Sequence, residues 1–182
     1  MGEIDSLVAQ EGAVGSYLDY LKASGDINRF CAGLKTHIQS QNEKLFPLLN
    51  ELDQARQNNL QNQYSLVRKR FQSANAQLYF LLKRYDIECP SSPELNKPIL
   101  YFFADVGPCA ECTLQAGILD HLRETCKQPI QIFAFPIEGG IEPIDLLVKD
   151  YNITHAPSLV INDETYSGVQ SPSQLNQLLS CQ

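Results

Sequence analysis

Residues 97–112 read KPILYFFADVGPCAEC, and this stretch decides how the second half of the chain folds. Residues 98–104 form a short apolar and aromatic run, which is typical of a buried strand. A turn leads from this run to Cys109 and Cys112, and a helical pattern of apolar residues follows as far as Cys126. The apolar positions of that helix are Leu114, Ile118 and Leu122. The sequence therefore predicts a strand, a turn with a C-x-x-C pair, and a helix that begins at the pair.

The rest of the second half alternates strands and helices. Asn162 and Asp163 are expected to form a turn between two short strands, and Ser171 followed by Pro172 is a typical start of a helix. The further elements that we expect are strand 130–135, helix 142–150, strands 158–161 and 165–167, and helix 172–179. The predicted order is β-α-β-α-β-β-α.

Composition and charge divide the chain near residue 90. Nine of the ten prolines follow this point, whereas Gln and Asn are dense before it. Residues 1–89 hold ten acidic and ten basic side chains, and residues 90–182 hold eleven acidic and four basic ones. We therefore expect a helical region at 1–89, a linker at 90–96 and an α/β domain at 97–182.

The first half contains two heptad seams, at residues 27–55 and 60–85, separated by a polar turn at 57–59. If the chain folds back at this turn, facing positions keep a constant sum of residue numbers, and Leu45 faces the small Ala74. The pattern predicts an antiparallel helical hairpin with arms of about 45 Å. Pro47 is expected to kink or break the first arm, because it lacks an N–H group.

An amphipathic stretch precedes the hairpin, with its apolar face at Leu7, Val14, Leu18 and Leu21. Gly12 and Gly15 weaken this helix, because glycine has a low helix propensity. No apolar run approaches the roughly 18–20 residues that a membrane span requires. The formal charge of −7 argues against a nucleic-acid partner, which requires a basic face.

The fold-back that aligns the two seams also brings Cys31 close to Cys89. A disulfide between them would close a loop that stabilises the fold by about 4 kcal/mol in the chain-entropy model. The alternative is that Cys31 is a small buried apolar residue and Cys89 an unpaired thiol in the linker. The register of the seams favours the disulfide.

The spacing of Cys109 and Cys112 has a chemical reason. Cys109 would lie at the N-terminus of a helix, where free backbone N–H groups stabilise a thiolate. That thiolate can attack a disulfide, and Cys112, one helical turn later, can attack the resulting mixed disulfide and release the product. The two residues are therefore the candidate catalytic pair.

Residues 97–180 resemble a thioredoxin-fold domain in three respects. A C-x-x-C pair follows a buried strand, Pro157 precedes a hairpin, and the elements come in the matching order. The resemblance implies a cis peptide bond at Pro157, next to the redox pair, and a backbone edge at Ala156 and Pro157 that binds a client peptide. It also implies that Cys126 and Cys181, at the ends of two helices on one face of the sheet, lie close enough for a second structural disulfide.

The sequence also departs from that family. The tryptophan before the pair is absent, and an aromatic residue, Tyr101 or a neighbour, stands where thioredoxins carry a buried acid. Glu111 and Asp105 place negative charge near Cys109, so we expect a less acidic thiol than in strongly oxidising relatives. His155 and Glu111 are candidates for proton transfer, and the alternative for His155 is a solvated loop residue.

Taken together, these features predict a protein thiol–disulfide oxidoreductase without a metal or another cofactor. Zinc is not expected, because it requires four ligands and the chain offers a single close cysteine pair. The expected partners are protein clients with thiols or disulfides, a redox partner protein and a second copy of the chain held through the helices. The alternative is a redox-inactive interaction module whose hairpin binds partners or forms oligomers.

Six cysteines in three pairs also predict an oxidising compartment outside the cytoplasm, such as the periplasm or cell surface. We expect an upstream signal or membrane anchor that this chain lacks, because residues 1–5 do not resemble a signal peptide. The alternative is a cytoplasmic enzyme in which Cys31, Cys89, Cys126 and Cys181 stay reduced.

Overall fold

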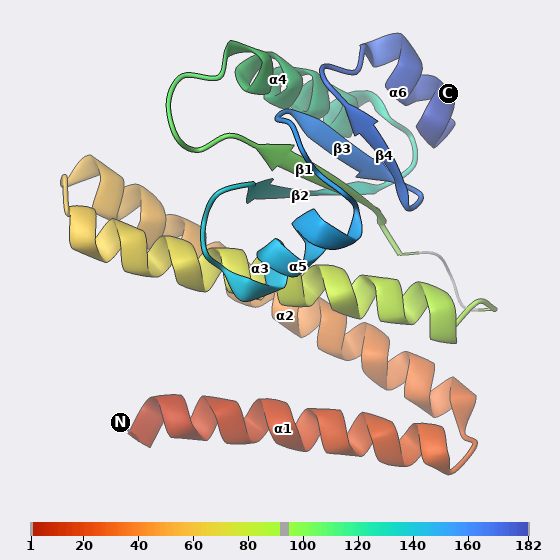
Figure 1. Cartoon of the computed structure of the whole chain (residues 1–182). Helices are drawn as coiled ribbons and strands as arrows, with labels where there is room; N and C mark the ends of the chain where they lie inside the picture. Colours follow the sequence, from red (N-terminus) through yellow and green to blue (C-terminus); the bar gives the residue numbers. More distant parts are fainter. Residues whose placement is uncertain (1, 92–94, 182) are drawn as a thin grey trace.

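The computed structural model describes residues 2–91 and 95–181, with side chains from residue 9 onward. Within these ranges it contains six helices and a four-stranded mixed sheet (Figure 1), which confirms the predicted mixed α/β class. The helices are α1 (Gly2–Ala23), α2 (Ile27–Gln57), α3 (Gln61–Glu88), α4 (Ala110–Thr125), α5 (Glu142–Asp150) and α6 (Pro172–Leu179). The strands are β1 (Lys97–Phe103), β2 (Ile130–Pro136), β3 (Ser158–Ile161) and β4 (Glu164–Ser167).

Several predictions from the sequence fall outside the described part of the chain. Residues 92–94 of the predicted linker and the side chain of Leu7 in the first helix are among them. None of the helices in the described ranges is both long and apolar enough to cross a membrane.

The sheet has the strand order β2-β1-β3-β4. Strand β1 is parallel to β2 and antiparallel to β3, so that Tyr101 lies opposite both Ala134 and Leu159. The last two strands form a hairpin through Asn162 and Asp163, which both adopt positive φ angles, as a tight two-residue turn requires. The central position of β1 explains its continuous apolar run, because both of its faces are covered.

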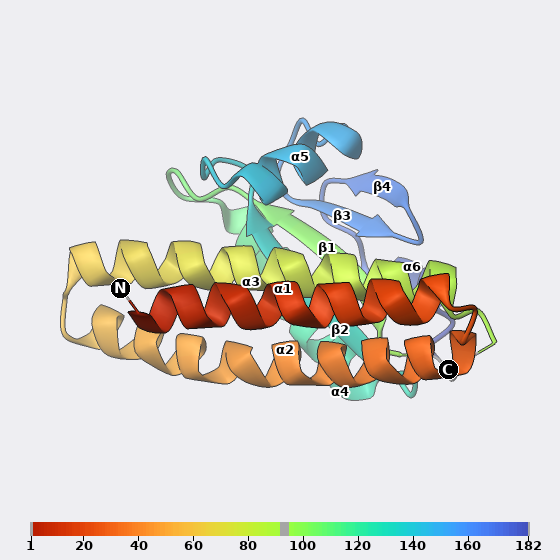
Figure 2. The same cartoon turned by 90° about the horizontal axis from the view of Figure 1, so that it is seen from below.

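Helices cover both faces of the sheet (Figures 1 and 2). On one face, Ile99 and Tyr101 of β1 join an apolar cluster with α4 and α6. On the other face, Leu100 and Phe102 join a cluster that includes α3 and α5. This alternation is the two-residue period of an extended strand.

The first half forms the predicted antiparallel hairpin from α2 and α3 (Figure 2). The expected break at Pro47 is wrong, because α2 continues through it without interruption. Pro47 and Glu43, four residues earlier, are both exposed, so water can satisfy the carbonyl that loses its helical hydrogen bond. The seam is also shorter than predicted, since Ile27 and Leu60 at its two ends are largely exposed.

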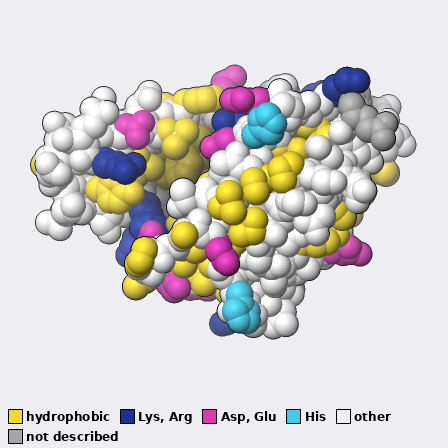
Figure 3. Space-filling model, turned by 90° about the horizontal axis from the view of Figure 1, so that it is seen from above, with side chains coloured by type: hydrophobic (Ala, Val, Ile, Leu, Met, Phe, Trp, Pro, Cys, Tyr) yellow, Lys and Arg dark blue, Asp and Glu magenta, His cyan; other side chains and the backbone are white. Residues whose placement is uncertain are grey.

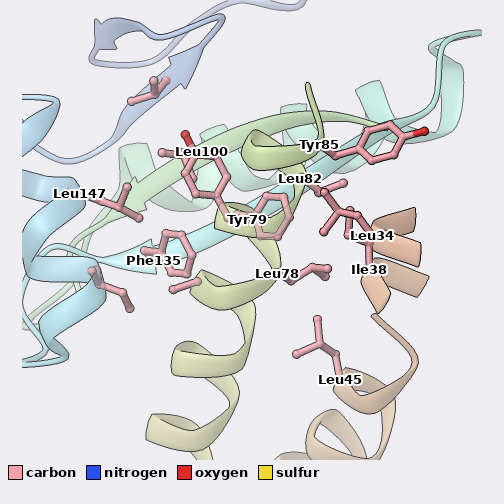
Figure 4. Close-up of a cluster of buried hydrophobic side chains, with 14 of the residues drawn as sticks. Leu34, Ile38, Leu45, Leu78, Tyr79, Leu82, Tyr85, Leu100, Phe135 and Leu147 are labelled. Atoms are coloured by element: carbon pink, nitrogen blue, oxygen red, sulfur yellow. The ribbon is translucent and has the colours of Figure 1, made fainter. Parts of the chain in front are cut away.

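Helix α3 is buried on two sides. One side carries the predicted seam toward α2, whereas the other packs on the sheet and α5 (Figure 4). The buried residues of the second side are Gln72, Asn75, Ala76 and Tyr79. Figure 4 shows Tyr79 beside Leu100 and Phe135 of the sheet, with Leu147 of α5 completing the cluster. The sequence pattern did not indicate this face, because two of its four residues have polar side chains.

Helix α1 packs on α2 near the open end of the hairpin. Leu18 and Leu21 of α1 are buried there, as the amphipathic pattern predicts. The two helices approach closely at Gly33, where an added Cβ atom would lie 3.2 Å from the Cδ2 atom of Leu18. Glycine at this position therefore allows the contact.

A disulfide between Cys31 and Cys89 joins α2 to the end of α3, with a Cα–Cα distance of 5.8 Å. This is the pair that the hairpin register predicts. Both residues are buried, and Glu88 beside them accepts hydrogen bonds from Lys22 of α1 and Arg84 of α3. The open end of the three-helix layer is therefore fixed by a covalent bond and an ion-pair network.

The hairpin and the sheet also share polar contacts. The hydroxyl groups of Tyr79 and Tyr151 lie 2.9 Å apart, and the Tyr151 hydroxyl donates to Asp163 at 2.8 Å. Lys83 of α3 donates to both carboxylate oxygens of Asp163. This network and the shared apolar cluster hold the hairpin against the sheet.

We predict that Phe135→Ala destabilises the helices and the sheet together. Phe135 is fully buried in the shared cluster, so its truncation should lower the free energy of unfolding by about 3–5 kcal/mol. Urea unfolding followed by far- and near-ultraviolet circular dichroism should give coincident transitions. Phe46→Ala is the control, because Phe46 is exposed on α2 and its loss should change stability by roughly 0.5 kcal/mol or less. Separate transitions for helices and sheet would contradict the shared core.

We predict that Asp163 makes the stability depend on pH in the acid range. The hydrogen bond from Lys83 holds the pKa of this carboxyl below its ordinary value of 3.8. The ionised form therefore stabilises the fold above that value, and the contribution is lost as the pH falls through the lower pKa of the folded state. The difference in unfolding free energy between wild type and Asp163→Asn should be constant above about pH 5 and shrink toward zero near pH 2. Urea titrations from pH 2 to 7 measure it, and Asp53→Asn, an exposed aspartate on α2, is the control.

Candidate redox site

The C-x-x-C pair lies at the start of α4, after the loop that follows β1. Cys109 and Cys112 form a disulfide in the structure. Cys109 is the N-cap of α4, and its Sγ atom accepts a hydrogen bond of 3.1 Å from the backbone N–H of Cys112. An unpaired N–H group at a helix start stabilises negative charge on such a sulfur. The arrangement can therefore hold a thiolate at Cys109 once the disulfide is reduced.

The two sulfur atoms differ in access to solvent. Cys109 is half-buried, whereas Cys112 is only 6 % exposed and belongs to the apolar cluster under α4. An outside disulfide can therefore approach Cys109 more readily than Cys112. This difference fits an attacking and a resolving thiol, respectively.

Tyr101 supports the pair from β1 below. Its buried hydroxyl donates a hydrogen bond of 2.7 Å to the backbone carbonyl of Cys112. Burial raises the pKa of the Tyr101 phenol to about 12. The phenol therefore stays protonated near neutral pH and acts as a donor, not as a base.

The buried face of α4 differs from the predicted one. The sequence pattern selected Leu114, Ile118 and Leu122, but Leu114 is 57 % exposed. The buried residues are Cys112, Gln115, Leu119 and Leu122. Gln115 hid this face from the pattern because it is polar, although its spacing from Cys112 and Leu119 is helical.

Gln115 ties α4 to the segment after β4. Its Oε1 atom accepts a hydrogen bond of 2.6 Å from the backbone N–H of Gln170. Two residues earlier, the N–H of Gly168 donates to the carbonyl of Pro157 at 2.8 Å. These bonds connect the redox helix to the Pro157 segment, and sequence reasoning did not identify Gln115.

Pro157 directly precedes β3, and the peptide bond between Ala156 and Pro157 is cis. Pro157 is buried, and Ala156 packs on the apolar cluster that also contains Cys109 and Cys112. The structure thus brings the predicted client-binding residues and the redox pair to one cluster.

The predicted proton-transfer residues, His155 and Glu111, are both exposed. His155 is exposed, and its Nδ1 atom shares a hydrogen with the Thr154 hydroxyl at 2.8 Å. Glu111 is exposed in the first turn of α4. Within the described ranges, the structure gives neither side chain a hydrogen bond or ion pair with the redox pair.

Asp105, in the loop after β1, forms an ion pair with the hairpin. Its carboxylate forms an ion pair of 2.6 Å with Arg68 of α3, so its negative charge is balanced. The sequence places this charge near Cys109 but does not indicate the ion pair with Arg68, because the two residues come from different halves of the chain.

The surface around the pair is partly apolar. Val106, in the turn before Cys109, is 77 % exposed, and Leu114 follows on the outer side of α4. Figure 3 shows the side of the molecule that carries α4, where apolar side chains gather in a band among mostly uncharged polar atoms. Exposed apolar patches of this kind are typical of contact surfaces.

A second disulfide ties down the far end of α4. Cys126, the C-cap of α4, is bonded to Cys181 after α6, with a Cα–Cα distance of 4.8 Å. This is the pairing that the resemblance to the thioredoxin fold implies.

In the part of the chain that is described, no group of three or more His, Cys, Asp or Glu side chains is arranged to hold a metal ion.

No protein-family model matches the chain, and no curated protein matches it. Among solved structures, one described as the structure of a malarial protein is 21 % identical with a TM-score of 0.36. The match covers 47 % of this chain and 96 % of that chain.

We predict that Tyr101→Phe weakens the support beneath the pair without unfolding the protein. The variant loses the hydrogen bond to the Cys112 carbonyl, so the free energy of unfolding should fall by about 1 kcal/mol. Urea denaturation of the oxidised protein measures this change. Tyr20→Phe, on the exposed side of α1, is the matched control and should have almost no effect. An equal effect in both variants would show that the bond has no special role.

Proposed function

We propose that this protein is a thiol–disulfide oxidoreductase of the thioredoxin-like class that acts on protein clients. The observation that carries the proposal is the position of Cys109 as the N-cap of α4, with its sulfur bonded to Cys112 and accepting the Cys112 N–H. The half-buried attacking sulfur, the buried resolving sulfur and the cis peptide bond at Pro157 also support it.

In the reduced enzyme, the reaction with a client disulfide would begin at Cys109. Its thiolate attacks one client sulfur, a bond forms between the two sulfur atoms, and the other client sulfur leaves as a thiolate that takes a proton from water. The free N–H groups at the start of α4 stabilise the attacking thiolate. The exposed Val106 and Leu114 offer apolar contacts to the client.

Cys112 would then resolve the mixed disulfide. Its thiolate attacks the Cys109 sulfur, the internal disulfide forms, and the second client sulfur is released as a thiol after protonation. The client gains two electrons and two protons, and the enzyme becomes oxidised. A dithiol donor returns the enzyme to its reduced form, and the reverse sequence transfers the disulfide to a client dithiol.

We further propose that the protein works outside the cytoplasm. Its three disulfides are compatible with an extracellular protein, because such bonds persist in oxidising compartments. The buried Cys31–Cys89 bond and the Cys126–Cys181 bond would be structural, since each joins the ends of helices away from the start of α4.

We predict that Cys109→Ser abolishes the reduction of insulin with dithiothreitol as electron donor. The serine hydroxyl cannot form the mixed disulfide, so the rate should fall at least about 100-fold, to the uncatalysed background. Cys112→Ser should instead accumulate a mixed disulfide with insulin, visible on a non-reducing gel, because the resolving thiol is missing.

The control for this assay is Cys126→Ser with Cys181→Ser. This double variant removes a disulfide from the other end of the same helix, so its activity should stay within about two-fold of wild type at a temperature where it is folded. Catalysis by Cys109→Ser at the wild-type rate would overturn the proposed function.

A further inference from the structure

The described residues include one fully buried polar side chain on the redox helix that is only half satisfied. Gln115 is 0 % exposed and lies one helical turn after Cys112. Its Oε1 atom accepts from the Gln170 N–H, whereas its Nε2 atom is buried without a hydrogen-bond partner. An apolar residue could fill this position if packing were its only role. A buried amide group without a hydrogen-bond partner is unfavourable, so its presence requires another reason.

The contacts fix which end of the amide is free. The partner of Gln115 at 2.6 Å is a backbone N–H of Gln170, which only donates, so the amide oxygen must face it. The NH₂ group is therefore the unpaired end. It is a pure donor, and a sulfur atom that gains negative charge is a suitable acceptor.

Gln115 shares a face of α4 with the resolving cysteine, because residues three apart in a helix lie on one face. Side chains in a helix lean in general toward its N-terminus, which is the direction of Cys112. Cys112 is itself buried, so its sulfur has little access to water when the disulfide opens. The Tyr101 hydroxyl donates its hydrogen to the backbone carbonyl of Cys112, so it does not donate to the Cys112 sulfur.

We propose that Gln115 is a positioning residue of the redox site. Its carbonyl holds the segment of Pro157, Gly168 and Gln170 against the redox helix, and its free NH₂ group donates to the Cys112 sulfur when the pair is reduced. The inference rests on the proposed function, because it assigns a role in the reduced state of the same pair. In the oxidised state the sulfur is bonded to Cys109, and the donor stays unpaired.

The equilibrium of the pair with glutathione tests this role in Gln115→Met. Reduction of the disulfide by two glutathione molecules gives the enzyme dithiol and oxidised glutathione, so the equilibrium constant compares the two states of the pair directly. Loss of the donor should destabilise the reduced state and shift the equilibrium about ten-fold toward the disulfide. A loss of packing alone would destabilise both states equally and leave the constant unchanged.

Gln72→Met is the matched control. Gln72 is also a buried glutamine with an unpaired amide atom, but it lies on α3 across the sheet from α4. Its variant should leave the equilibrium within about two-fold of wild type. A shift below two-fold in Gln115→Met, or the same shift in both variants, would overturn the inference.

A measurement on the unmodified protein covers the case in which Gln115→Met does not fold. In NMR spectra of the wild type, the Gln115 side-chain amide protons should shift downfield and exchange more slowly with solvent on reduction, whereas the Gln72 amide should not change. Unchanged Gln115 signals would also overturn the role. The proposed function itself fails if the Cys109–Cys112 pair does not equilibrate with glutathione and if wild type is as inactive in the insulin assay as Cys109→Ser.

Discussion

Burial of α3 on two opposite sides is the constraint on which the arrangement of the molecule depends. One side packs on α2 through Leu78 and Leu82, and the other packs on the sheet through Ala76 and Tyr79 (Figure 4). A helix with this much buried surface cannot move without exposing apolar atoms on one side. The hairpin therefore covers one face of the sheet, and α4 and α6 cover the other. This packing holds β1 in place and so positions the C-x-x-C pair that follows it.

The three disulfides have the same chemistry but very different surroundings. Cys31 and Cys89 are both buried at the open end of the hairpin. Cys126 and Cys181 join two helix ends, and neither is the N-cap of a helix. Among the cysteines in the described ranges, a sulfur accepts a backbone N–H at a helix start only in the Cys109–Cys112 pair. The backbone around each bond, and not the bond itself, separates the candidate site from the structural pairs.

Local patterns in the sequence predicted most of the elements and the cysteine pairs. The strand and helix order follows from β1, the turn residues and the Ser171 cap, and the register of the hairpin pairs Cys31 with Cys89. The sequence pattern failed where polar residues are buried. Gln72 and Asn75 concealed the second side of α3, and Gln115 concealed the buried side of α4, because a periodic search counts apolar residues. Long-range ion pairs such as Arg68–Asp105 leave no periodic signal at all.

The division of charge between the halves has a structural consequence at the redox site. Residues 1–89 have no net charge, and residues 90–182 carry the whole net charge of −7. Two basic residues of α3 nevertheless reach acidic residues of the second half, Arg68 at Asp105 and Lys83 at Asp163. Asp105 lies four residues before Cys109, so its pairing removes a negative charge that would otherwise oppose a thiolate there. The helical hairpin thus contributes to the electrostatics of the candidate site as well as to its mechanical support.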